Sequence, residues 1–234
     1  MGDTTGGFES MNSSITIEKR SLLDLDWSQH LRGRFNKFPL HHVPGGRKPN
    51  KIILHYTAGT RAEPGQAYIY RESWHNSWHE NPKFEVSADF CVDKGTIVQF
   101  NPKLTHFYSF STRDDSKAIT IEMCSTFNKS LNPNLVMKEL QPNMPQWYFE
   151  QEVLDNTKLL IIELFKFYGK MDIITHYDVP KSDGSRKSCP GIIGWNTGQL
   201  FDKDKKPLGT RNNTKEFEKF KKEVYEMWDE INEK

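Results

Sequence analysis

The segment 175–191 constrains this chain most, because it places a histidine, a lysine and a cysteine around one loop. His176 follows the short apolar run 171–174, which predicts a buried strand with the imidazole at its end. Cys189 precedes Pro-Gly, a turn signal that fixes where its sulfur points. Imidazole and thiolate are both zinc ligands, and a catalytic zinc needs a third protein ligand and an open position. The sequence therefore calls for one more histidine.

His55 is the best candidate for that ligand. It follows the apolar run 51–54, a second predicted strand, and precedes small, turn-forming residues at 56–60 that leave room beside a metal. Two histidines at two strand ends and one cysteine in a tight loop form a facial set of three ligands.

A rival site is the pair His75 and His79. Residues 63–79 predict an amphipathic helix with an aromatic face, on which histidines four residues apart share one side. No glutamate follows His75 in the pattern of helical zinc peptidases, and no third ligand has a recognisable spacing. His41 and His42 also lack a spaced partner and are interpreted as loop histidines.

Three segments together resemble a known family. Residues 52–57 (IILHYT), 175–179 (THYDV) and 186–191 (RKSCPG) are similar to the three zinc-site motifs of the type-2 N-acetylmuramoyl-L-alanine amidases. That family includes phage endolysins and, more distantly, peptidoglycan recognition proteins. Residues 118–123 (AITIEM) resemble the strand that carries the catalytic glutamate in many of its bacterial and phage members. The resemblance covers about residues 48–231, with the four motifs in the family's order.

The resemblance implies a zinc-dependent peptidoglycan amidase. Zinc would be held by His55, His176 and Cys189, and the bond cut would join the lactyl group of N-acetylmuramic acid to L-alanine. Glu122 would accept a proton from water and pass it to the leaving amine, while Lys187 would stabilise the oxyanion. A carboxylate within so apolar a run needs a partner, and an ordinary ion pair with Lys or Arg is the structural alternative for Glu122.

The substrate groove is expected to include Thr57 and His106. The segment 104–110 stands where the family commonly has a Trp-His pair, although His106 could also be an incidental loop histidine. Some members place a catalytic tyrosine before a hairpin, which is predicted here as strands 86–92 and 96–100. The matching positions are Ala88 and Asp89, so that tyrosine is missing.

The fold predicted is an α/β domain with a central mixed β-sheet flanked by helices. Residues 1–47 form an N-terminal extension, flexible to about residue 16, and residues 48–234 form the amidase domain. Residues 125–146 are predicted as a long surface loop or lid, 147–168 as a helix ended by Gly169, and 214–231 as a terminal helix. Between the last two helices only an insertion containing Gly and Lys is recognised.

Charge and composition limit the partners. The 32 basic and 31 acidic residues leave a net charge of +1, so nucleic acid is not an expected partner. No apolar run approaches the ~20 residues of a membrane span, and the N-terminus lacks the regions of a secretory signal. We expect a monomer made in the host cytoplasm that acts on the bacterial cell wall. The odd number of cysteines argues against a disulfide framework, and Cys91 and Cys124 are expected in the core.

Two other classes of function stay open. A non-catalytic peptidoglycan-binding protein would keep the groove and lose ligands, whereas here all three ligands accompany Glu122 and Lys187. A protein with a purely structural zinc would close the fourth position with another Cys or His, and none stands next to these motifs. A phage-type endolysin for degradation of the host wall is the favoured function.

Overall fold

The computed structural model describes residues 16–18, 40–70, 73, 88–101, 104–109, 112 and 115–233. Six strands form a mixed central sheet in the order β1-β5-β4-β7-β3-β10. Their bounds are Thr16–Glu18 for β1, Lys51–Tyr56 for β3, Phe90–Val92 for β4, Thr96–Gln99 for β5, Ala118–Met123 for β7 and Asp172–Thr175 for β10. Strands β4, β7, β3 and β10 run parallel, and β5 is antiparallel to β4.

The neighbouring strands β7 and β3 are largely buried. Every residue of β7 is buried, as are four of the six residues of β3. Such runs suit parallel strands covered on both sides. The predicted α/β class with a mixed sheet is confirmed, and so is the hairpin formed by β4 and β5 around residues 93–95.

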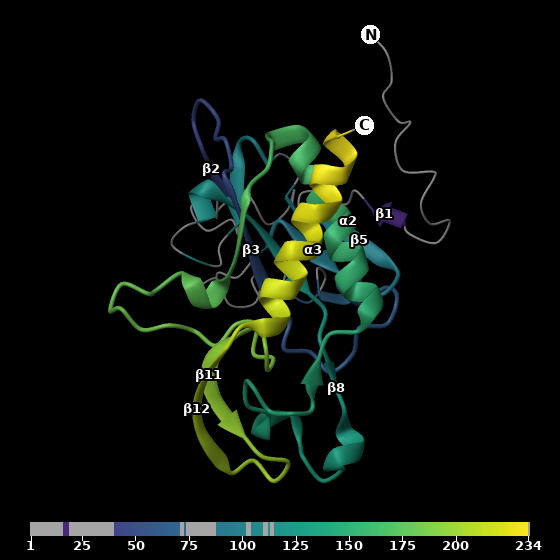
Figure 1. Cartoon of the computed structure of the whole chain (residues 1–234), viewed down its shortest axis with the longest axis vertical. Coiled ribbons are helices and arrows are strands. Elements are labelled where there is room, and N and C mark those ends of the chain that lie inside the picture. The colour runs from purple at the N-terminus through teal and green to yellow at the C-terminus, as the bar shows by residue number, and fades with distance from the viewer. Residues whose placement is uncertain are drawn as a thin grey trace, which may run out of the picture.

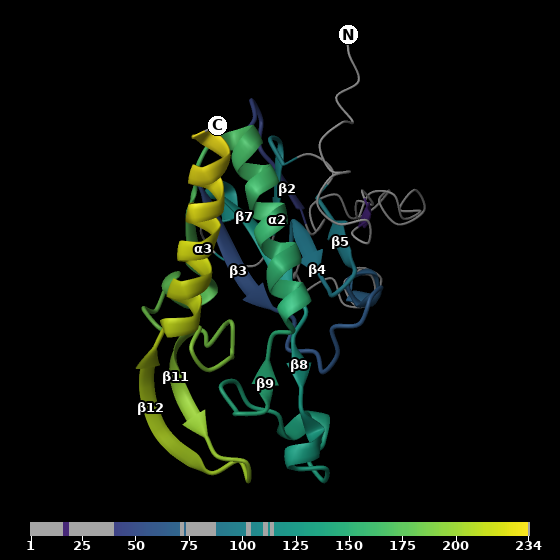
Figure 2. The same ribbon diagram turned by 45° about the vertical axis from the view of Figure 1, so that its right-hand side comes forward.

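Two long helices lie over one face of the sheet, α2 (Gln151–Tyr168) next to it and α3 (Lys215–Asn232) alongside α2 (Figures 1 and 2). α2 ends at Gly169, whose φ of 83° suits glycine, as predicted. The apolar side of α3 buries Phe217, Phe220 and Val224. The prediction of a helix from residue 147 was wrong at its start, because residues 147–148 form a strand instead.

Two projections lie beyond the carboxyl ends of the parallel strands (Figures 1 and 2). Neither was predicted as a pair of strands. The first runs from β8 (Thr126–Phe127) through two 3-10 turns to β9 (Trp147–Tyr148), which pairs with β8. The second is the antiparallel hairpin of β11 (Asn196–Phe201) and β12 (Pro207–Asn213). The insertion after Gly191 is therefore a β-hairpin.

The two projections are joined to each other. The side-chain amides of Asn132 and Gln146 both donate to the backbone carbonyl of Lys203, at 3.1 and 3.3 Å. The first projection also contacts the loop after Cys189, where the backbone N–H of Asn143 donates to the carbonyl of Gly191 at 2.6 Å. Asn143 and Met144 are buried. The prediction of a surface loop over residues 125–146 therefore does not hold for the end of that segment.

The predicted extension 1–47 contributes two short strands, β1 to the central sheet and β2 (Leu40–His42) to a pair with β6 (Phe107–Ser109). His41 and His42 thus belong to a strand and not to a loop. The tail before residue 16 and the pair His75 and His79 lie outside the described residues. Residues 66–70 are helical, in agreement with the predicted aromatic helix as far as it is described. None of the described helices is long and apolar enough to cross a membrane.

Candidate metal centre

The parallel register of the sheet brings the predicted ligands to one edge. His55 is the fifth residue of β3 and pairs with Glu122 on β7. His176 comes directly after β10, in the 3-10 turn His176–Asp178, and β10 pairs with the other side of β3. Because carboxyl ends of parallel strands meet at the same edge, three chemically active side chains converge there from segments far apart in sequence.

His55, His176 and Cys189 form one buried cluster whose donor atoms all lie within 4.8 Å of one another. The two Nδ1 atoms are 3.1 Å apart, and the sulfur of Cys189 lies 3.7 Å from Nδ1 of His55. Tetrahedral zinc at its usual bond lengths requires separations of about 3.3 Å between two nitrogens and about 3.6 Å between nitrogen and sulfur. The two separations that involve His55 are therefore close to those of a tetrahedral zinc site.

Burial favours the protonation states that a metal needs at its histidines. The pKa of His55 is lowered well below its ordinary value by burial, then by His176 and Lys187. The pKa of His176 is lowered to about 4 by burial, then by Lys187 and Lys181. Both imidazoles are therefore neutral near pH 7. Burial raises the pKa of Cys189, so in the metal-free protein the thiol keeps its proton.

The loop that carries Cys189 is fixed to the turn that carries His176. Tyr177 donates its backbone N–H to the Cys189 carbonyl at 2.9 Å, and Arg186 donates to the Tyr177 carbonyl at 2.8 Å. The guanidinium of Arg186 also lies over the Tyr177 ring, 5.4 Å from its centroid. These contacts fix the positions of His176 and Cys189 relative to each other.

Glu122 is a buried carboxyl beside the cluster, and one of its oxygens accepts no hydrogen bond. Its Oε1 lies 3.8 Å from Nδ1 of His55, and its buried Oε2 has no hydrogen-bond partner. An ordinary ion pair with Lys or Arg was the structural alternative for Glu122. No Lys or Arg among the described residues forms such a pair. Burial raises its pKa to about 8, partly offset by the positive charge of Lys187. An unpartnered carboxyl oxygen next to three metal donors fits a water molecule between them.

Lys187 acts electrostatically on the residues of the cluster. Its side chain is exposed, yet its charge acts on both histidines, Glu122 and Cys189. No fourth Cys or His joins the cluster among the described residues. Cys91 and Cys124 are instead buried free thiols with their sulfurs 3.8 Å apart, as the core placement predicted.

The two predicted groove residues differ in position. Thr57 follows β3 near the cluster, where its hydroxyl accepts from the backbone N–H groups of Gly59 and Ser125, both at 3.3 Å. His106 is not brought to the cluster. Its ring bonds to Thr105 at 2.8 Å, and Thr105 accepts from the N–H of Arg47. Arg47 reaches the carbonyl of Ala118, at the opposite end of β7 from Glu122.

Sequence reasoning missed two tyrosines beside the centre. The backbone N–H of Tyr56 hydrogen bonds to the sulfur of Cys189, and the phenol of Tyr56 lies against Gly191. Tyr70, from the helical residues 66–70, hydrogen bonds to the side chain of Thr57. The position of Tyr70 on the aromatic face of that helix could have indicated a place near the site. An aromatic face alone, however, is equally typical of core packing.

Asp89, at a position compared with the family tyrosine, is a structural residue. It is fully buried, accepts from the side chain of Asn101 at 2.6 Å and from the N–H of Thr120 at 2.9 Å, and lies 3.8 Å from Arg47. These contacts fasten the segment before β3 to β7. The contacts of Asp89 therefore connect neighbouring segments of the core.

The pKa shifts predict an unusual pH profile of stability for the metal-free protein. Folded Glu122 holds its proton to about pH 8, whereas the unfolded carboxyl releases it near 4.5, so the free energy of unfolding falls as pH rises between these values. The lowered pKa values of the two histidines act oppositely below pH 6.5. We expect the greatest stability of the chelated protein near pH 6.5 and a loss of about 2 kcal/mol by pH 8.

Urea unfolding at a series of pH values measures this profile. The control is Glu122→Gln, which cannot ionise and should show no decline between pH 6.5 and 8. An equal decline in that variant would assign the effect to another group.

Comparison with known proteins assigns the chain to a family. The family model described as N-acetylmuramoyl-L-alanine amidase matches residues 45–192, more than half of the chain. No curated protein sequence matches.

Several solved structures are similar at low identity. The N-acetylmuramoyl-L-alanine amidase LysC from Clostridium intestinale URNW is 16% identical with a TM-score of 0.47, and the match covers 92% of this chain and 99% of that one. The catalytic domain of XlyA is 22% identical with a TM-score of 0.41, covering 66% and 82%. The Ph2119 endolysin from Thermus scotoductus MAT2119 bacteriophage Ph2119 is 18% identical with a TM-score of 0.42, covering 70% and 90%. The family assignment rests on the family model.

Proposed function

The chain belongs to the N-acetylmuramoyl-L-alanine amidase family, and on that premise we propose that it cleaves its substrate with a zinc ion held by His55, His176 and Cys189. Membership makes the chain a peptidoglycan amidase, and the bond hydrolysed joins N-acetylmuramic acid to L-alanine. The observation that carries the zinc proposal is the agreement of the donor separations, 3.1 and 3.7 Å, with those of a tetrahedral ion.

The chemistry divides between the metal and two side chains. Held by His55, His176 and Cys189, a zinc ion would supply Lewis-acid chemistry for the substrate carbonyl and for a water molecule. Glu122 accepts the proton of the attacking water on its free Oε2 and delivers it to the nitrogen of the departing L-alanine. Lys187 presents its ammonium group to the negative charge that develops on the carbonyl oxygen.

The charges around Glu122 bear on this role. Without metal, burial raises the pKa of the carboxyl to about 8, and a zinc ion beside it would act in the opposite direction and favour the ionised form that a base requires. Its two main influences, burial and Lys187, act in opposite directions. The positive charge of Lys187 thus keeps a share of Glu122 ionised and competent as a base.

Substrate contacts are proposed for Thr57, which lies just past the end of β3. A groove contact for His106 stays a prediction. Its position beside Thr105 and Gly46 does not favour that contact.

Digestion of purified peptidoglycan by the zinc-loaded protein tests the proposed reaction. Mass spectrometry should find glycan strands with free lactyl carboxyl groups and stem peptides with free L-alanine amines. Products cut within the glycan or within the stem peptide would contradict the proposal.

We further propose that the enzyme is a phage-type endolysin that degrades the host cell wall. The resemblance of the four motifs to endolysin members of the family supports this role. Expression in a host bacterium tests it, because such an enzyme should lyse the cells only when a separate membrane pore is supplied. Lysis-free growth with the pore present would contradict the role without affecting the assigned chemistry.

A further inference from the structure

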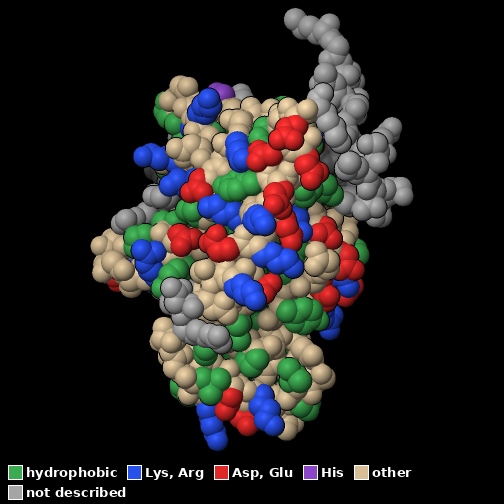
Figure 3. All heavy atoms as spheres, in the orientation of Figure 1, with side chains coloured by type: hydrophobic (Ala, Val, Ile, Leu, Met, Phe, Trp, Pro, Cys, Tyr) green, Lys and Arg blue, Asp and Glu red, His purple; other side chains and the backbone are tan. Residues whose placement is uncertain are grey.

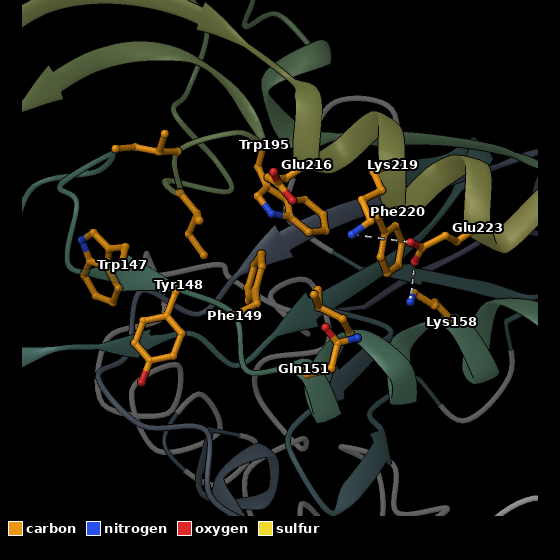
Figure 4. Close-up of a pocket in the computed structure, with 13 residues that line it drawn as sticks. Trp147, Tyr148, Phe149, Gln151, Lys158, Trp195, Glu216, Lys219, Phe220 and Glu223 are labelled. Atoms are coloured by element: carbon orange, nitrogen blue, oxygen red, sulfur yellow. Dashed lines mark ion pairs between the residues drawn. The ribbon is translucent and has the colours of Figure 1, made fainter.

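A cavity lies where the first turns of α2 and α3 meet the segments 147–149 and 192–195 (Figure 4). Its volume is about 460 Å³, and none of His55, His176, Cys189, Glu122 or Lys187 lines it. Pockets that hold small organic ligands commonly have volumes of roughly 300–1,000 Å³. The cavity is therefore large enough for one or two sugar rings.

The apolar part of the cavity is a fixed group of aromatic rings. Phe149 and Trp195 meet edge to face at 4.9 Å, and Trp195 lies 5.3 Å from Phe220. Figure 4 shows these three side chains coming from three different segments and turning toward one another. Tyr148 is 39% exposed at one side of the cavity, and its hydroxyl donates to Glu150 at 3.2 Å. The cavity thus offers a rigid floor and one accessible ring face.

The polar part is balanced in charge. Lys158 lies 2.7 Å and Lys219 3.9 Å from the carboxylate of Glu223, and Glu216 also lines the cavity. With two lysines and two glutamates, the lining of the cavity carries no net charge that would attract an ionic ligand. Figure 3 shows acidic and basic side chains intermixed over this face of the molecule. Such a lining favours a neutral ligand with many hydroxyl groups.

Trp195 brings an indole donor to the same cavity. The residue is 4% exposed and lines the cavity, yet its indole N–H forms no hydrogen bond with any described residue. Buried tryptophan usually finds a partner for this group. A ligand carbonyl or hydroxyl in the cavity would provide it.

We propose that this cavity is a second, non-catalytic binding site for N-acetylated sugar units of the glycan strand. The C–H faces of a pyranose ring are apolar and pack against aromatic rings, while its hydroxyls and acetamido group bond to an indole N–H and to charged side chains. The choice of wall glycan as the occupant rests on the proposed function. A site of this kind holds the enzyme on an insoluble polymer and raises the local concentration of scissile bonds.

The test uses a tetramer of N-acetylglucosamine, which has no lactyl group and no peptide and so contains no bond for the metal centre to cut. Titration should give saturable quenching of tryptophan fluorescence. Trp195→Phe keeps a ring and removes the donor, and Tyr148→Ala removes the exposed ring, so each should weaken binding about tenfold. The matched control is Phe167→Ala, which deletes an aromatic ring of α2 that is 83% exposed and outside the cavity.

Activity readouts keep this inference separate from the proposed function. Trp195→Phe and Tyr148→Ala should hydrolyse a soluble muramoyl-peptide at the wild-type rate and digest insoluble wall more slowly, whereas Glu122→Gln should bind the tetramer normally. Absence of saturable binding by a protein that cleaves muramoyl-peptide would overturn the second site alone. Binding that persists unchanged in both variants would also overturn it. Binding by a protein without amidase activity would sink the proposed function and leave the site standing.

Discussion

Alanine at position 55, 176 or 189 should each remove the metal and, with it, all measurable amidase activity. Each change leaves only two donors at the cluster, and two are too few to hold zinc against water and buffer. We expect about one zinc per wild-type chain by elemental analysis and close to none in these variants. Chelation of the wild-type protein should abolish activity, and added zinc should restore it.

His75→Ala and His79→Ala are the matched controls, because they remove histidines of the rival site and should keep both zinc and activity. Metal loss in these two variants with retention in the other three would move the centre to the predicted helix. A metal-free preparation with full activity would refute the zinc mechanism outright.

Glu122→Gln should separate metal binding from catalysis. Glutamine keeps the shape of the side chain but cannot accept a proton, so zinc content should stay near wild type while kcat falls roughly 10²-fold or more. The carboxyl is not one of the three donors in the cluster, which is why the metal should be retained. Turnover of a soluble muramoyl-peptide, measured beside zinc content, checks both halves of the prediction.

Lys187→Met provides a comparison in the same assay. It removes a charge that acts on Glu122 and on the oxyanion, at a cost of about 3 kcal/mol in the barrier, and it should likewise spare the metal. A Glu122→Gln protein that cleaves at the wild-type rate would make another group the base, and Tyr70, through its bond to Thr57, would be the next to test.

The grouping of His55, His176 and Cys189 could be predicted because each of these residues stands beside a strong local signal. Apolar runs before His55 and His176 predict strands, and the carboxyl ends of parallel strands meet at one edge of a sheet. Cys189 is fixed by the turn that follows it. Chemistry and periodicity agree at these three positions, so reasoning from the residues was sufficient to group them, and the structure brings them together.

The parts that failed lack such signals. The hairpin of β11 and β12 contains Gly, Lys and Asn in place of the alternating apolar residues that identify a strand, because it projects from the body and buries little. Trp147 and Tyr148 suit a strand or a helix equally, and only their pairing with β8 decides. The location of His106 depends on the pairing of β2 with β6, which no short pattern predicts.

The three residues of the buried cluster lie far apart along the chain, so the ribosome makes them at different times. Cys189 follows His55 by 134 residues, so a ribosome adding about 5–20 residues per second completes the donor set roughly 7–27 s after the first ligand is made. Small zinc fingers capture metal with ligands close in sequence and fold around it. Here the sheet must pair β3 with β10 before the cluster exists. On the proposed zinc role, a largely folded chain would acquire the metal, and a cell short of zinc should accumulate folded protein that added zinc can later activate.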